Sequence, residues 1–74
     1  MATDIQFVSV SSSNIAALAF TEEDSTLYVR FNGGQVYSYA GVPKANYEAL
    51  LNAPSVGKLF NAHIKPYYDG EQVE

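Results

Sequence analysis

The chain has no cysteine, no tryptophan, a single histidine and only four basic residues among its 74 residues. Without cysteine, no disulfide can form and no thiol is present to act as a nucleophile or a metal ligand. A structural zinc site needs Cys and His ligands above all, and the one histidine, His63, does not supply them. We therefore expect no metal and no cofactor, and a fold that its hydrophobic core alone stabilises.

Long hydrophobic runs are missing as well. The longest uncharged apolar stretch, NIAALAF at residues 14–20, is far too short to span a bilayer. The N-terminal residues MATDIQ include an acid and no basic residue, which is not the pattern of a secretory signal. We expect a cytoplasmic protein without a membrane partner.

Apolar and aromatic side chains, in contrast, are plentiful. Hydrophobic residues make up 47% of the chain and aromatic residues 14%, with six Tyr and four Phe. A disordered chain would be poor in these residue types. The length is near the lower limit for a domain that folds without disulfides, so the composition predicts one small folded domain.

The net charge of −4 argues against nucleic-acid binding by the protein as a whole. The acids are unevenly spread, however. Seven of the eight lie in one apparent turn and at the two ends: Asp4, Glu22, Glu23, Asp24, Asp69, Glu71 and Glu74. Residues 25–68 carry four basic residues against Glu48 alone, a net charge of +3. Either these basic residues form a local cationic patch, or they lie solvated on different faces: Arg30, Lys44, Lys58 and Lys65.

Alternating β-branched and aromatic residues predict strands in the first half of the chain. The clearest segments are residues 15–20, 26–31 and 35–39. Residues 7–10 are either a short strand or part of a mobile N-terminal segment. The acidic sequence TEEDS at residues 21–25 is typical of a hairpin loop.

The sequence NGG at residues 32–34 predicts a second β-hairpin, since Asn and Gly tolerate positive φ angles. The length of this loop decides the environment of Tyr37 and Tyr39. A two-residue loop places both tyrosines on the face of Arg30, because one residue of register turns every side chain over. A three-residue loop with a bulged glycine places them with the apolar residues of the preceding strand, and we favour it because a small domain needs these side chains in its core: Leu27, Val29 and Phe31.

Two helices are predicted in the second half. The first covers residues 42–53, where Pro43 suits the first helical turn and the apolar residues follow helical spacing. The second covers residues 55–65, with Ser55 as its N-cap. The tail after it is a short edge strand or frayed. The predicted fold class is α+β, a small antiparallel β-meander of about three strands packed on one face by two C-terminal α-helices.

Catalytic signatures are absent from the sequence. His63 could be a general base or a ligand, but no Ser-His-Asp, Cys-His or paired-His spacing accompanies it. We favour a partly buried, hydrogen-bonded histidine. The run from Glu22 to Asp24 lacks the alternating ligands of a calcium loop and is interpreted as a solvated turn. The sequence therefore predicts a protein that is not an enzyme.

Two segments suggest binding instead. SVGK at residues 55–58 begins a helix, whose free N–H groups and partial positive charge can hold an anion. The same segment is also interpreted as an ordinary cap, with glycine allowing close packing. The tyrosines could form a base-stacking platform or fill the core with their hydroxyls at the surface. The candidate binding residues are Arg30, Tyr37, Tyr39, Lys44, Ser55, Gly57, Lys58 and Lys65.

The order of several short motifs resembles the KTSC domain, named from the C-terminus of some lysyl-tRNA synthetases and also found as stand-alone bacterial and phage proteins. The matching features are Ser11-Ser12-Ser13, LYVRF, the glycine turn, Tyr37 and Tyr39, Val42-Pro43, Tyr47, IKPYY, and the run Ala53, Ser55, Gly57, Lys58, Phe60 and Asn61. One departure is Phe20-Thr21, where family members often carry Tyr-Asp. The resemblance covers residues 11–68, which leaves residues 1–10 as the N-terminal segment and 69–74 as an acidic tail.

The resemblance implies a binding module and no catalytic residues, because none are defined for the family. It suggests an RNA ligand, chiefly because the domain occurs at the C-terminus of some lysyl-tRNA synthetases. Our leading hypothesis is a small non-enzymatic module that binds RNA or another polyanion. The alternative is a protein-interaction domain, with homodimerisation as one form of it, that uses an exposed sheet face or edge.

Overall fold

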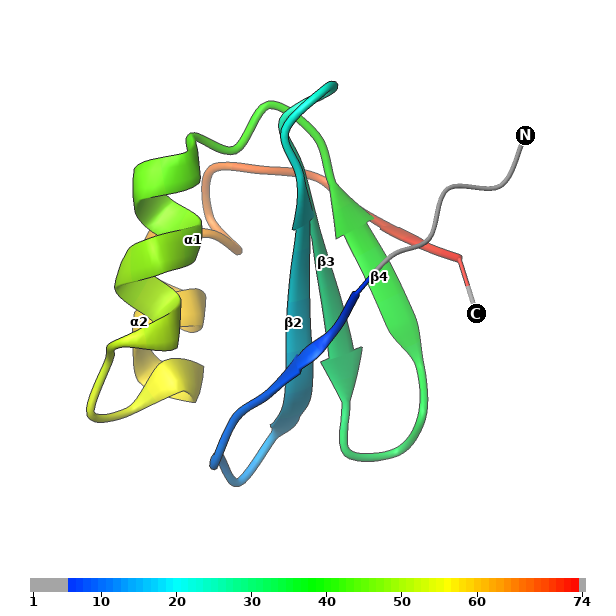
Figure 1. The fold of residues 1–74 in the computed structure, drawn as a ribbon. Helices are drawn as coiled ribbons and strands as arrows, with labels where there is room; N and C mark the ends of the chain where they lie inside the picture. Colours follow the sequence, from blue (N-terminus) through cyan, green and yellow to red (C-terminus); the bar gives the residue numbers. More distant parts are fainter. Residues whose placement is uncertain (1–5, 74) are drawn as a thin grey trace.

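The computed structural model describes residues 6–73. Residues 1–5 of the predicted N-terminal segment and Glu74 of the predicted acidic tail lie outside the described residues. Five strands form one antiparallel sheet in the order β1-β2-β3-β4-β5, and two helices lie between β4 and β5 in the chain. The elements are β1 (Val8–Ser9), β2 (Ile15–Thr21), β3 (Thr26–Phe31), β4 (Val36–Tyr39), α1 (Lys44–Leu51), α2 (Val56–His63) and β5 (Gly70–Gln72). Figure 1 shows both helices on one face of the sheet.

The α+β class and the one-sided helical cover agree with the sequence, but the expected count of about three strands was too low. The two further strands, β1 and β5, lie at the two edges of the sheet and contain two and three residues. Both were left open by the sequence, residues 7–10 as a short strand or a mobile segment and the tail as a short edge strand or frayed, and the structure has a strand in each place. Strands this short show no alternation of apolar and polar residues that would decide between the alternatives. β5 pairs with β4, which makes residues 70–72 part of the sheet.

The β3–β4 hairpin has the three-residue loop, as predicted. Val29 pairs with Tyr37 and Leu27 with Tyr39, and Phe31 N–H donates to the Gln35 carbonyl at 2.8 Å. Gly34 has a φ of +100°, the left-handed conformation that a bulged glycine supplies. Both tyrosines therefore lie on the helix-covered face, where Tyr39 is buried and Tyr37 is half-buried.

The core lies between this face and the helices. Its largest fully buried side chains are Ile15, Leu18, Leu27, Leu50, Ile64, Val29 and Val42. They come from β2, β3, the segment before α1, α1 and the residue that follows α2. Tyr39 of β4 and Val56 and Phe60 of α2 belong to the same cluster. A domain of this size buries little apolar surface in total. Truncating any one of these side chains should therefore lower its stability.

The two helix starts differ from the predictions in detail. Pro43 is the N-cap of α1 with extended angles, φ −63° and ψ 144°, rather than a residue of the first helical turn. Ser55 is the N-cap of α2, as predicted, but its side chain makes no capping hydrogen bond. The connection before α1 is fixed elsewhere, because Val42 N–H donates to the Ser25 carbonyl at 2.9 Å.

The β2–β3 turn is solvated, as predicted, with Glu22, Glu23 and Asp24 exposed, and local hydrogen bonds also hold its shape. Ser25 has a positive φ of 52°, and the Thr21 hydroxyl donates to an Asp24 carboxylate oxygen at 2.5 Å. Hydrogen bonds from Thr21, and then Thr26, hold the pKa of Asp24 below its usual value. Glu22 forms an exposed ion pair with Lys44 at the start of α1. The turn and α1 are thereby tied together.

Candidate functional site

A cleft of about 460 Å³ opens on the helix-covered side of the sheet. The β3–β4 hairpin forms one wall, α2 and the residue that follows its last turn form the other, and the start of β2 closes one end. Its lining combines aromatic rings, carboxamides and one lysine: Asn14, Phe31, Gln35, Tyr37, Tyr39, Phe60, Asn61 and Lys65. We call this the aromatic cleft.

Four rings of the aromatic cleft pack edge to face. Phe31 lies against Tyr37 with ring centroids 5.6 Å apart at 83°, and against Phe60 at 5.9 Å and 74°. Tyr39 meets Phe60 at 5.4 Å and 77°. Such T-shaped pairs fix the orientation of each ring. Because Tyr39 and Phe60 are buried while Phe31 and Tyr37 are half-buried, the first two form the floor and the last two offer ring surface to a ligand.

Strand β5 borders the tyrosine pair. Gln72 pairs with Tyr37 and Gly70 with Tyr39, and the Tyr37 hydroxyl donates to Gln72 Oε1 at 3.4 Å. Burial raises the pKa of Tyr39, and the neighbouring Tyr37 adds to the shift. Tyr39 is therefore a neutral phenol at physiological pH, suited to hydrogen bonding and packing rather than to charge.

The polar end of the cleft depends on a turn before β2. Ser12 Oγ accepts hydrogen bonds from the N–H groups of Asn14 at 3.2 Å and Ile15 at 3.3 Å. Asn32 holds the same turn from the hairpin loop, donating to the Ser12 and Ser13 carbonyls. Gly57 on α2 lies so close that a Cβ there would be 3.3 Å from Ser12 Oγ. The glycine thus lets α2 approach the turn that presents Asn14 to the cleft.

Only some of the predicted binding residues meet at this cleft. Tyr37, Tyr39 and Lys65 line it, and Gly57 packs behind it. Ser55 and Lys58 line a separate, shallower surface between the helices.

The remaining two predicted residues are engaged elsewhere. Lys44 pairs with Glu22, whose hydrogen bond and charge raise the pKa of Lys44. Arg30 alternates with the core-facing residues of β3 and lies 4.2 Å from the Phe7 ring centroid in a cation–π contact. The four basic residues therefore have four different surroundings, which favours the second of the two alternatives, separate placement rather than one cationic patch.

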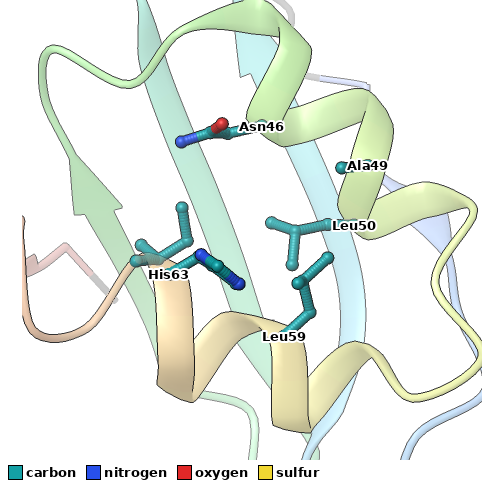
Figure 2. A pocket seen from close by; sticks show the side chains of 6 residues that line it. Asn46, Ala49, Leu50, Leu59 and His63 are labelled. Carbon is teal, nitrogen blue, oxygen red and sulfur yellow. The ribbon is translucent and has the colours of Figure 1, made fainter.

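His63 is exposed, which corrects the expectation of a partly buried side chain. It lies at the edge of a smaller cavity of about 230 Å³ between α1 and α2, where Figure 2 shows it with Asn46, Leu50 and Leu59. Among the described residues, no group of three or more His, Asp or Glu side chains is placed to hold a metal. In the same part of the chain, no helix has the length and apolar character needed to cross a membrane.

Sequence reasoning missed five residues of the aromatic cleft as binding candidates: Asn14, Phe31, Gln35, Phe60 and Asn61. Phe60 and Asn61 belong to the motif run that resembles the family, and Phe31 ends LYVRF, so the motifs carried a signal for three of them. Asn14 and Gln35 follow ordinary turn sequences and have no comparable signal. The serine triplet, the glycine turn, the tyrosine pair and the α2 motif all converge on this one region.

Comparison with known proteins identifies the family. The KTSC domain matches residues 11–68. An uncharacterized protein of Stutzerimonas stutzeri is 38% identical over 61 residues, which cover 82% of this chain and 86% of that protein. A lysine–tRNA ligase of Nostoc punctiforme is 39% identical over 61 residues, which are 82% of this chain but 11% of the ligase. The crystal structure of a KTSC domain protein from Yersinia pestis has a TM-score of 0.88 and 28% identity, and the match covers 96% of this chain and 100% of that one.

The chain belongs to the KTSC domain family. It is a small α+β domain, and the Stutzerimonas stutzeri relative of similar length is an uncharacterized protein. The lysine–tRNA ligases contain a similar segment as a small part of a much longer protein.

Proposed function

We propose that this protein is a non-enzymatic module that binds single-stranded RNA weakly through the aromatic cleft. One observation carries the proposal: half-exposed aromatic rings, three carboxamide side chains and a lysine line the same cleft. Proteins recognise unpaired RNA by stacking bases on aromatic rings and by hydrogen bonding to the base edges. The aromatic cleft offers both kinds of contact in one place.

Each group has a defined part in this binding mode. A base stacks on Phe31 or Tyr37, since these rings are half-buried and held in place by their neighbours. Asn14, Gln35 and Asn61 can donate and accept hydrogen bonds at the edges of a base. Lys65 contacts an adjacent phosphate. The cleft therefore suits one or two unpaired nucleotides rather than a duplex.

Weak binding follows from the charges. Lys65 is the one basic residue among those lining the cleft, and the net charge of the chain is −4. Few phosphate contacts mean a shallow dependence on salt and an affinity in the nonspecific range of about 10⁻⁴ to 10⁻⁶ M. Stacking adds about 1–3 kcal/mol for each base that finds a ring. The relatives support an RNA ligand, since a similar domain is part of lysine–tRNA ligases.

An NMR titration of the ¹⁵N-labelled protein with a short unpaired oligoribonucleotide at low salt tests the proposal. We expect the largest shifts at the amides of Phe31, Tyr37, Asn61 and Lys65. Lys65→Gln should weaken binding and flatten its salt dependence. Lys58→Gln is the matched control, because Lys58 carries the same charge on α2, before Lys65 in the chain, but lies outside the aromatic cleft.

Two results would contradict RNA binding at this cleft. One is equal weakening by Lys65→Gln and Lys58→Gln, which would mean diffuse electrostatic attraction. The other is an absence of shifts on adding RNA, with shifts that appear only as the protein concentration rises. That second result would favour self-association through one of the two sheet edges, since Val8 of β1 is 45% exposed at one edge and Val73, just after β5, is 48% exposed at the other.

A further inference from the structure

The two helices enclose a second hollow, separate from the aromatic cleft. Its volume is about 230 Å³ and its floor is apolar. Figure 2 shows Leu50 of α1 and Leu59 of α2 pointing toward each other, with the polar ends of Asn46 and His63 at its margin. We call this hollow the helix socket.

A shallower surface continues from the helix socket along the helix pair. The two share Ala49 and Leu59, and the continuation also includes Ala53, Lys58 and Ala62. The small side chains of the alanines let the backbone of a partner come close to both helices. Socket and continuation together form one elongated apolar groove.

The size of the helix socket indicates what enters it. Sites for small molecules usually enclose about 300–1,000 Å³, and the socket is below this range at about 230 Å³. It can take one apolar side chain but not a drug-sized ligand. A socket for one anchoring side chain, continued by a shallow apolar surface, is the pattern of a groove that receives an amphipathic helix.

The residues that line the groove also indicate whether its partner is a nucleic acid or a protein, and which charge that partner carries. Among the described residues that line the groove there is no Phe or Tyr, in contrast to the four such rings of the aromatic cleft, and the exposed imidazole of His63 is the one aromatic ring. A base would therefore have only the His63 imidazole to stack on, and no set of packed rings. The lining likewise contains no Asp or Glu, and its one charged residue is the basic Lys58, beside the imidazole N–H donor of His63. In a protein of net charge −4, this groove is complementary to an acidic partner.

We propose that the groove between α1 and α2 docks an acidic amphipathic helix of a partner protein. One apolar side chain of that helix inserts between Leu50 and Leu59, and its acidic residues face Lys58 and His63. This inference does not rest on RNA binding, because it uses a different surface. A single protein molecule could hold RNA in the aromatic cleft and the partner helix on the outside of its helix pair.

A synthetic probe peptide tests the inference. Its leucines are spaced at i, i+3, i+4 and i+7, with glutamates on the flanking positions, and a second peptide has lysine in place of each glutamate. We expect the acidic peptide to shift the amides of Ala49, Leu59 and Ala62 in the ¹⁵N-labelled full chain. Lys58→Glu should weaken its binding about tenfold or more, and the basic peptide should not bind.

Ala49→Glu places a carboxylate in the groove and should abolish binding, and Ala45→Glu is its control on an exposed position of α1 outside the groove. Ala62→Glu places a carboxylate in the same groove from α2. It provides the test if Ala49→Glu lowers the melting temperature of the protein. Three results would overturn the inference: no shifts with the acidic peptide, equal binding of the two peptides, or equal effects of Ala49→Glu and Ala45→Glu.

Discussion

The ring of Tyr39 lies directly across Gly70. The two residues are partners in the β4–β5 pair, and a Cβ built on Gly70 would be 2.6 Å from Tyr39 Cε2 and 2.8 Å from its hydroxyl oxygen. Non-bonded carbon atoms do not come this close, so a side chain at position 70 would force the Tyr39 ring or the strand to shift. The start of β5 therefore needs glycine because the tyrosine of the cleft floor occupies the space of a side chain.

Gly70→Ala should consequently destabilise the protein by about 1–3 kcal/mol, the range for overpacking a well-filled site. Gly33→Ala is the matched control, since a Cβ there would meet the flexible Gln35 amide at 2.7 Å, and this side chain can move aside. Chemical unfolding of the three proteins measures the difference. Equal stabilities of the two variants would mean that Tyr39 does not lie across Gly70 in solution.

The tyrosine pair should divide into a structural and a binding member. Tyr39 is 5% exposed, and Tyr39→Ala should lower the free energy of unfolding by about 3–5 kcal/mol. Tyr37 is half-buried, and Tyr37→Ala should cost about 1–2 kcal/mol, in proportion to the smaller area that it buries. Thermal and urea unfolding of both variants gives the comparison. If Tyr37→Ala loses more free energy of unfolding than Tyr39→Ala, then Tyr37 and not Tyr39 is the ring packed in the core.

The different burial of Tyr37 and Tyr39 shows how much of the structure the sequence could predict. The NGG loop and the demand of a small domain for core side chains were enough to predict the register, and with it the face of Tyr37 and Tyr39. They were not enough to predict that one ring is covered more than the other. Tyr39 packs against Phe60 of α2, whereas Tyr37 packs against Phe31 of the same hairpin, and a contact between elements so far apart in the chain has no signal in the sequence pattern.

The candidate site was harder to predict than the fold. Charge was the most visible signal in residues 25–68, yet Lys44 pairs with Glu22 and Arg30 lies over Phe7. Both contacts join residues more than twenty positions apart, and spacing along the chain does not show them. The carboxamides of the cleft, such as Asn14, come from turns whose sequences are ordinary. Convergence of separate motifs can be seen only once the chain is folded.

The two serines near the start of α2 should differ in importance. Ser55 makes no capping hydrogen bond, so Ser55→Ala should cost a few tenths of a kcal/mol rather than the roughly 1 kcal/mol of a working cap. Ser12 accepts from two backbone N–H groups, and Ser12→Ala should cost about 1 kcal/mol. Urea unfolding of the two single variants and the double variant decides this. The reverse order would mean that Ser55 caps α2 in solution.

Alkaline pH should destabilise the protein through Tyr39. Burial raises its pKa above the ordinary value of 10.0, so the folded chain holds this proton more tightly than the unfolded chain does. The contribution of Tyr39 to stability is then complete below the ordinary pKa, and it is lost as the pH rises from there through the raised pKa of the folded state. Burial also raises the pKa of Tyr47, which adds a second loss in the same direction.

Tyr39→Phe removes the ionising hydroxyl and keeps the ring, so this variant should lose less free energy of unfolding than the parent between neutral and strongly alkaline pH. Tyr67→Phe is the control, because Tyr67 is 72% exposed and its replacement removes no buried hydroxyl. Urea unfolding at a series of pH values gives the slope for each protein. If Tyr39→Phe and Tyr67→Phe lose stability as steeply as the parent, ionisation of Tyr39 is not what limits the fold at high pH, and Tyr47→Phe becomes the variant to measure.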